Sequence, residues 1–105
     1  MAEVVVVAFA KAKAGSEDEV LAILTPVVEA THGEPGNVKY TLNRGLQDPS
    51  TFVIIERWAS QEDLDKHGKQ PHMAALGELG QHLEGGVTII PLEALGVGEP
   101  RKATL

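Results

Sequence analysis

The sequence predicts an α+β domain of the ferredoxin-like type, with a four-stranded antiparallel sheet covered by helices on one face. Segments with strand and helix patterns follow in the order β-α-β-β-α-β, which is the split β-α-β arrangement. The chain has 105 residues, enough for one compact domain, and its 43% hydrophobic content is that of a protein with a packed core. We therefore expect one domain over residues 1–95 and a tail over residues 96–105, either mobile or packed on a partner subunit.

The first strand and the first helix are expected within the first third of the chain. Residues 4–10 form a short run rich in β-branched valine, which is typical of a strand. Ser16 stands three residues before Glu19, the spacing of a capping box, so a helix should begin there and end near His32. Pro26 lies inside this helix and lacks a backbone donor, which predicts a kink.

The middle of the chain predicts a hairpin of two strands. Turn-forming residues occupy positions 33–37, and apolar and polar residues then alternate over residues 38–43. Residues 51–58 are rich in β-branched and aromatic side chains, and residues 45–50 have the length of a hairpin connection. Two adjacent antiparallel strands follow from this pattern.

A split helix and a last strand complete the predicted fold. Ser60 is a candidate N-cap for a short helix, and Pro71 suits the first position of a second helix that runs until the two glycines at 85–86. Residues 87–95 then have the composition of a strand, in which Pro91 requires an edge position or a bulge.

Charge and composition exclude several classes of partner. Nine Lys and Arg against fifteen Asp and Glu give a net charge of −6, the wrong sign for neutralising phosphates, so we expect no nucleic acid partner. The chain has no cysteine, and it has no apolar run of the roughly 18 residues that would span a bilayer. We expect a cytoplasmic protein without a membrane partner.

Strand alternation places apolar residues on both faces of the expected sheet. Val53 and Ile55 point away from the face shared by positions 52, 54, 56 and 58, and the strand at residues 4–10 has no polar alternation. Helices cover only one of the two faces, so a monomer would expose the other to water. We therefore predict a homodimer that packs sheet against sheet about a two-fold axis.

Glu56, His67 and His72 are the candidate acid–base residues. Glu56 lies in an apolar row of its strand, where burial would raise its pKa. His67 follows Leu64 by three residues, and His72 lies beside the apolar stripe that begins at Met73, so both imidazoles should face inward. Together they would form an acid–base cluster that works near neutral pH. The alternative for each residue is structural, as a paired glutamate at a strand end or a histidine that fills the core or caps a helix.

Neither a metal nor a cofactor is expected. The two histidines are five residues apart with Gly68 and Pro71 between them, unlike the i, i+4 pair of a helical zinc site. The sequence contains no glycine-rich phosphate loop and no nucleotide fingerprint. Tyr40 and Trp58 either line a pocket or fill the core.

Three segments resemble the antibiotic biosynthesis monooxygenase (ABM) family, and they are EPGNVKY (34–40), FVIIERWAS (52–60) and HGKQPHM (67–73). The combined motif is an acidic residue, any residue and an aromatic residue, followed by His-x-x-x-Pro-His. The resemblance extends over about residues 3–95 and is nearest to quinol monooxygenase-like members. It implies a dimeric α+β barrel of two ferredoxin-like sheets, and oxygen chemistry on quinols or polycyclic phenols without metal, haem or flavin.

The resemblance also assigns roles to residues of this chain. Glu56, His67 and His72 would be catalytic. The residues expected to contact substrate are Tyr40, Phe52, Ile54, Trp58, Met73 and Leu76. The implied reaction is a cofactor-independent monooxygenation, in which a base removes a phenolic proton and the resulting anion reduces molecular oxygen directly.

Two other classes of function stay open. Related members act on a small phosphorylated signalling sugar, so one alternative is an isomerase or proton-transfer enzyme on a small carbonyl or phosphorylated sugar metabolite, with Glu56 and His67 as acid and base. The other alternative is a non-catalytic dimeric ligand-binding module. The scaffold alone does not choose among them, because one fold hosts unrelated functions.

Overall fold

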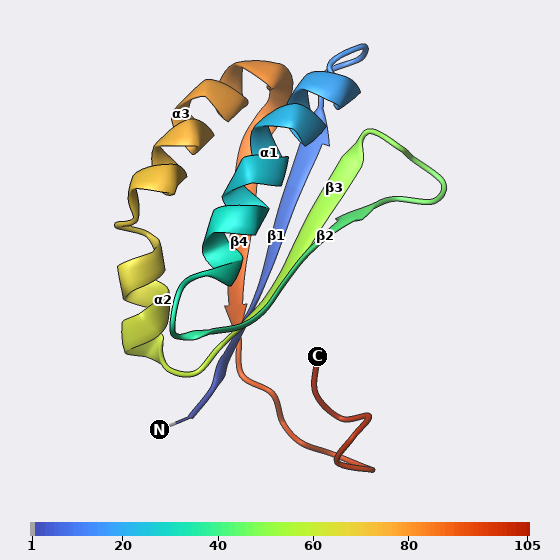
Figure 1. Cartoon of the computed structure of the whole chain (residues 1–105). Helices are drawn as coiled ribbons and strands as arrows, with labels where there is room; N and C mark the ends of the chain where they lie inside the picture. The colour runs from blue at the N-terminus through green and yellow to red at the C-terminus, as the bar shows by residue number, and fades with distance from the viewer. Residues whose placement is uncertain (1) are drawn as a thin grey trace.

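A computed structural model describes residues 2–105 as a four-stranded antiparallel sheet with the helices on one face (Figure 1). The strand order is β2-β3-β1-β4, and every neighbouring pair is antiparallel, which confirms the predicted ferredoxin-like fold. The elements are β1 (Val4–Ala12), α1 (Glu17–His32), β2 (Asn37–Arg44), β3 (Thr51–Trp58), α2 (Gln61–His67), the 3₁₀ turn η1 (Pro71–Ala74), α3 (Ala75–Leu79), the 3₁₀ turn η2 (Gly80–His82) and β4 (Leu83–Leu92).

The core lies between the helices and one face of the sheet. Along β3 the residues at 52, 54, 56 and 58 are buried, and those between them are partly exposed, as period-two alternation requires. Leu24 of α1 and Leu79 of α3 are buried against this face. Trp58 and Phe52 are the largest fully buried side chains, so this face of β3 is the centre of the core.

β4 begins at Leu83, inside the segment that the sequence predicted to be the end of a helix. Gly85 and Gly86, expected to terminate that helix, lie within the strand with φ angles of 77° and 73°. Such positive φ angles cost glycine little and other residues more. The pairing with β1 shifts its register at this point, so the two glycines form a β-bulge. Pro91 lies on this edge strand, as predicted.

Only one of the two predicted helix caps forms. The Asp63 N–H donates to Ser60 Oγ at 3.2 Å, and the Ser60 hydroxyl donates to the Asp63 carboxylate at 2.9 Å. Ser16 precedes α1, but its side chain makes no capping hydrogen bond, and its backbone is not in the extended conformation of a capping residue. α1 continues through Pro26 and ends at His32, where the sequence placed its end.

Gly36 fastens the turn after α1 to the segment after β3. Its carbonyl oxygen accepts the N–H of Ala59 at 3.0 Å. A Cβ atom on Gly36 would lie 2.1 Å from Cγ of Asp63, at the start of α2, so only glycine allows the two segments to approach this closely. The turn therefore lies beside the end of β3 and the beginning of α2, and Glu34 is carried there with it.

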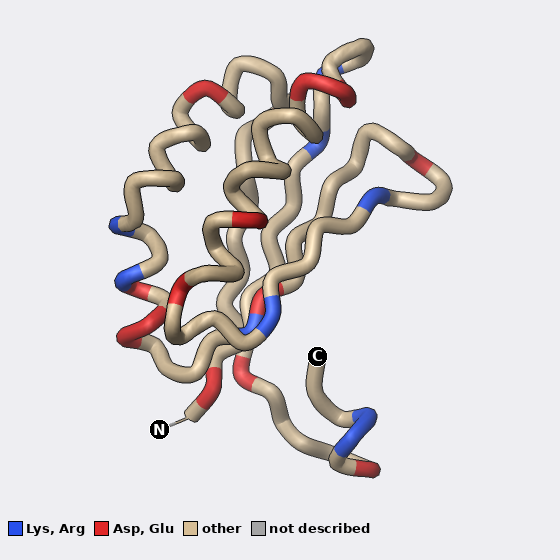
Figure 2. The backbone as a smooth tube through the Cα atoms, viewed as in Figure 1, with Lys and Arg blue, Asp and Glu red and all other residues tan. Residues whose placement is uncertain are grey.

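Charged residues are sparse along the middle of the strands and gather at strand ends, in loops and on the helices (Figure 2). After β4 the chain leaves the sheet, and the carbonyl oxygen of Leu105 accepts a hydrogen bond from Arg57 Nη1 of β3 at 3.3 Å. The tail therefore returns to its own chain at this point. No helix within residues 2–105 is both long enough and apolar enough to cross a membrane.

The close contact at Gly36 predicts a sharp difference between two glycine substitutions. We expect Gly36→Ala to lower the free energy of unfolding by about 1–3 kcal/mol, because the new methyl group forces Asp63 and the start of α2 to move. Gly77→Ala is the control, since a Cβ atom there meets nothing within 4 Å and alanine favours the helix by about 0.5–1 kcal/mol. Urea unfolding of both variants measures the difference, and equal stabilities would contradict the packing described for Gly36.

Candidate active site

A cavity of about 180 Å³ lies between the helix-covered face of the sheet and the helices, with predominantly apolar walls. Five of the six residues predicted to contact substrate line it, and they are Tyr40, Phe52, Ile54, Met73 and Leu76. The sixth, Trp58, is fully buried beside the cavity and is not among the lining residues. An apolar cavity of about 150 Å³ holds a benzene molecule, so this cavity has room for one aromatic ring.

Glu56 brings a carboxylate to this apolar cavity, and Trp58 holds it in place. The two residues are two positions apart in β3 and share a face, and Trp58 Nε1 donates to Glu56 Oε1 at 2.8 Å. Burial raises the pKa of Glu56, against the opposing effects of the Trp58 hydrogen bond and of the nearby His67. The hydrogen bond explains why an aromatic residue with an N–H group follows the acidic residue at this spacing.

Glu56 and His67 each have a polar atom without a hydrogen-bond partner that a ligand could meet. Every fully buried side-chain nitrogen or oxygen within residues 2–105 has a hydrogen-bond partner. Glu56 Oε2 and His67 Nε2 have no such partner, so they are accessible, and both residues line the cavity. A small set of polar atoms in an apolar cavity is the usual arrangement of a ligand site.

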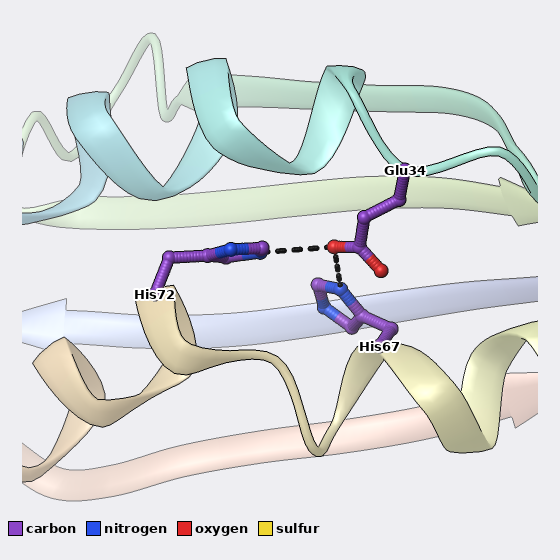
Figure 3. Close-up of side chains that lie close together, drawn as sticks. All are labelled: Glu34, His67 and His72. Carbon is purple, nitrogen blue, oxygen red and sulfur yellow. Dashed lines mark hydrogen bonds and ion pairs between the residues drawn. The ribbon is translucent and has the colours of Figure 1, made fainter.

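His67 is held by a carboxylate that the sequence reasoning did not identify. Its Nδ1 lies 2.7 Å from Oε2 of Glu34, in the turn between α1 and β2 (Figure 3). Its ring packs against the Trp58 indole with a centroid distance of 4.6 Å and against Tyr40 at 5.4 Å. Packing on two aromatic rings and a hydrogen bond to a carboxylate together set the orientation of this imidazole.

His72 reaches the same carboxylate but not the cavity. Its Nε2 lies 2.9 Å from Glu34 Oε2 and 3.3 Å from Thr31 Oγ1, and its side chain is 19% exposed (Figure 3). The three predicted catalytic residues therefore do not form one cluster. Glu56 and His67 share the cavity without a hydrogen bond between them, and His72, which contacts Glu34, is not among the residues that line it.

One signal in the sequence could have indicated Glu34. In an antiparallel hairpin the beginning of β2 lies beside the end of β3, and Asn37 indeed pairs with Trp58. A carboxylate in the turn just before β2 must therefore lie near Trp58 and the start of α2. This inference needs the strand pairing, and the residue pattern around Glu34 indicates only a turn.

Tyr40 contributes a phenol that stays protonated at neutral pH. Burial raises the pKa of its hydroxyl above the ordinary range, and the charges of Glu56 and Glu34 raise it further. A hydrogen bond with the Thr31 side chain lowers it, but by less. Tyr40 can therefore donate a hydrogen bond but cannot act as a base, whereas Glu56 and His67 can exchange protons with a ligand.

Glu34, His67 and His72 are also the group among residues 2–105 whose donor atoms could hold a metal ion, all within 4.8 Å of one another. Two imidazoles and one carboxylate form a donor set that suits zinc or iron. However, the separations of 2.7 and 2.9 Å from Glu34 Oε2 are those of hydrogen bonds, so a cation would have to replace both ring protons.

Comparison with known proteins agrees with this fold. The model of the family described as "Antibiotic biosynthesis monooxygenase" matches residues 3–79. "Putative monooxygenase YcnE" of Bacillus subtilis (strain 168) is 26% identical over 80 residues, which cover 76% of this chain and 84% of that protein.

Solved structures with the same fold include members of this family. One described as an antibiotic biosynthesis monooxygenase aligns with a TM-score of 0.83 at 29% identity, covering 88% of this chain and 98% of that one. Rv0793 from Mycobacterium tuberculosis shares the fold with a TM-score of 0.86 at 24% identity, covering 93% of this chain and 100% of that one. With a family match over most of its length, this chain belongs to the antibiotic biosynthesis monooxygenase family.

Proposed function

We propose that the protein is a cofactor-independent monooxygenase that oxidises a small quinol or aromatic phenol with molecular oxygen. The observation that carries the proposal is that Glu56, whose pKa is raised and whose Oε2 has no hydrogen-bond partner, lines the same apolar cavity as His67. Membership of the family and the monooxygenase name of a relative support the reaction class. The volume of the cavity favours a substrate with a single ring.

The proposed reaction requires a base and a cavity that excludes water, and no cofactor, because the substrate anion itself reduces oxygen. Glu56 or His67 removes a phenolic proton, and the electron-rich anion transfers one electron to oxygen. The phenoxyl radical and superoxide then combine at a ring carbon, and the peroxide formed loses water. A quinol and one oxygen molecule thereby yield a hydroxyquinone and one water molecule, so both atoms of oxygen are accounted for. The apolar walls keep solvent away from the radical pair.

A second function is favoured by one specific feature of the site. Glu56 and His67 are both proton-transfer groups facing one cavity, and neither requires oxygen to act. The same pair would suit an isomerase acting on a small carbonyl or phosphorylated sugar metabolite. Turnover in the absence of oxygen distinguishes this candidate from the monooxygenase.

We also propose that a second copy of the chain covers the open face of the sheet. Across this face Val7 pairs with Ile55 on one side and with Ile90 on the other, which makes an apolar row over three strands. Phe9 and Ile90 are each 41% exposed in the single chain. Apolar patches of this kind on a sheet commonly mark an interface between subunits.

Oxygen uptake tests the proposed activity. With a panel of single-ring and two-ring quinols, we expect metal-stripped wild type to consume oxygen above the spontaneous rate. Glu56→Gln and His67→Ala should each lower that rate by about 10²–10⁴-fold, the usual contribution of a positioned base. Glu62→Gln, on the exposed side of α2, is the matched control and should retain full activity.

The outcomes separate the candidate functions. Uptake that both active-site variants retain would show that Glu56 and His67 do not carry the chemistry. If no quinol is oxidised but a carbonyl metabolite turns over without air, the proton-transfer function replaces the monooxygenase.

The raised pKa of Glu56 predicts how stability changes with pH. Because its pKa is higher in the folded than in the unfolded chain, its contribution is fully present below the ordinary glutamate pKa and is lost as pH rises through the folded value. In Glu56→Gln the new amide oxygen would still accept the Trp58 hydrogen bond, but the side chain would not ionise. As pH rises above about 4, wild type should therefore lose stability relative to Glu56→Gln, as measured by urea unfolding. Parallel stability curves would contradict a raised pKa for this buried carboxylate.

The proposed dimer predicts the effect of a charge on the open face. Ile90→Lys should shift the protein from dimer to monomer, because a lysine cannot be buried in an apolar interface without a partner. Leu46→Lys, at a fully exposed position in the β2–β3 loop, is the control and should leave the dimer intact. Light scattering coupled to size exclusion measures the mass, and a monomeric wild type would overturn the proposal.

A further inference from the structure

We propose that Glu34 is a positioning residue that holds His67 with its proton on Nδ1, so that Nε2 faces the cavity as a proton acceptor. His72 contacts the same oxygen of Glu34 and helps to hold the carboxylate. The catalytic consequence rests on the proposed function, whereas the position of the proton is a property of the protein alone.

In the cluster of Glu34, His67 and His72, the chemistry of a carboxylate decides which atoms donate hydrogen bonds and which accept them. An ionised carboxylate oxygen only accepts hydrogen bonds, so a ring nitrogen in contact with it must carry the proton. Both His67 Nδ1, at 2.7 Å, and His72 Nε2, at 2.9 Å, contact Glu34 Oε2. The carboxylate therefore binds two N–H groups, which is the arrangement that best stabilises its charge in a buried place.

Thr31 gives independent support for this assignment. Its buried hydroxyl donates to the carbonyl oxygen of Val27 at 2.7 Å, so its single proton is already used. Toward His72 Nε2, at 3.3 Å, Thr31 Oγ1 can only accept. His72 must then carry a proton on Nε2, which agrees with its donation to Glu34.

The assignment decides which nitrogen of His67 is available to a substrate. With Nδ1 protonated and directed at Glu34, a neutral His67 has its lone pair on Nε2, the nitrogen of this cavity-lining residue that has no hydrogen-bond partner. In water the neutral histidine side chain favours the proton on Nε2, which would leave no base there. A carboxylate that holds the imidazole in the useful tautomer and stabilises its protonated form is the arrangement used in Ser-His-Asp triads.

The backbone around Glu34 is built to keep the carboxylate in place. The Glu34 N–H donates to the Thr31 carbonyl at 3.0 Å, and the Asn37 N–H donates to the Glu34 carbonyl at 3.0 Å. Pro35 follows with a fixed φ, and Gly36 fastens the turn to the segment that leads into α2. The side chains of Glu34 and His67 are only 8% and 6% exposed, so solvent does not compete for their hydrogen bond. A site residue supported in this way is preorganised.

Long-range ¹H–¹⁵N correlation of the histidine ring nitrogens tests the proposal in the free protein. At about pH 8.5, where an ordinary histidine is neutral, wild-type His67 should show a protonated Nδ1 and an unprotonated Nε2. In Glu34→Ala and the isosteric Glu34→Gln the share of this tautomer should fall, because the negative acceptor is gone. Glu29→Gln, on the exposed side of α1, should leave the spectrum unchanged. A wild-type His67 protonated on Nε2 would overturn the proposal, whatever the variants show.

Steady-state kinetics distinguish a positioning role of Glu34 from a purely structural one, because only the positioning role changes kcat without changing KM. With a quinol that wild type oxidises, Glu34→Gln should lower kcat by about 10–100-fold with little change in KM, because the residue acts on the base and does not touch the substrate. Unchanged kcat in a folded Glu34→Gln variant would overturn the positioning role. The spectra are the separate test: if they show the expected tautomer but no quinol is oxidised, the positioning of His67 stands and the monooxygenase proposal fails.

Zinc content provides the last test of the same cluster. Wild type incubated with Zn²⁺ and then dialysed against metal-free buffer should retain none, since binding would require both imidazoles to give up the N–H groups that Glu34 accepts. Stoichiometric Zn²⁺ retained by wild type and lost in Glu34→Gln would overturn the proposal, because the metal would then occupy the nitrogens assigned as donors.

Discussion

The hydrogen bond from Trp58 Nε1 to Glu56 Oε1 allows a carboxylate to lie in the core of this small domain. An unpaired carboxylate in an apolar cavity is costly, and one charge-assisted hydrogen bond offsets part of that cost. The bond satisfies one oxygen and leaves the other without a partner, in a residue that lines the cavity. Its geometry comes from the simplest property of a strand, that residues two apart share a face. The raised pKa of Glu56 is the part of the cost that remains.

The contact between Glu34 and His67 depends on the close approach of two segments far apart in the sequence. The turn that carries Glu34 and the end of α2 that carries His67 approach closely only because Gly36 has no side chain where Asp63 packs. The same Asp63 forms the cap of α2 with Ser60. A helix cap, a glycine and a carboxylate–imidazole hydrogen bond therefore act together, and each supports the placement of His67.

The sequence determined the fold and much of the cavity, because both follow from local pattern. Strand alternation placed Phe52, Ile54 and Glu56 on one face before any contact was known, and these residues do line the cavity. Local patterns fail where two elements meet. Gly85 and Gly86 have the composition of a helix end, but pairing with β1 turns them into a bulge inside β4. Interstrand hydrogen bonds outweighed the local preference there.

Only the tertiary structure decided which groups touch. The sequence placed His67 and His72 facing inward but could not identify their common partner, because Glu34 lies 33 and 38 residues away and becomes a neighbour only through the pairing of β2 with β3. It could not separate the role of Trp58 from that of the cavity walls, since the direction of an indole N–H depends on side-chain packing. Residue pattern decides which face a side chain is on, and the distance between faces is decided by how the elements pack.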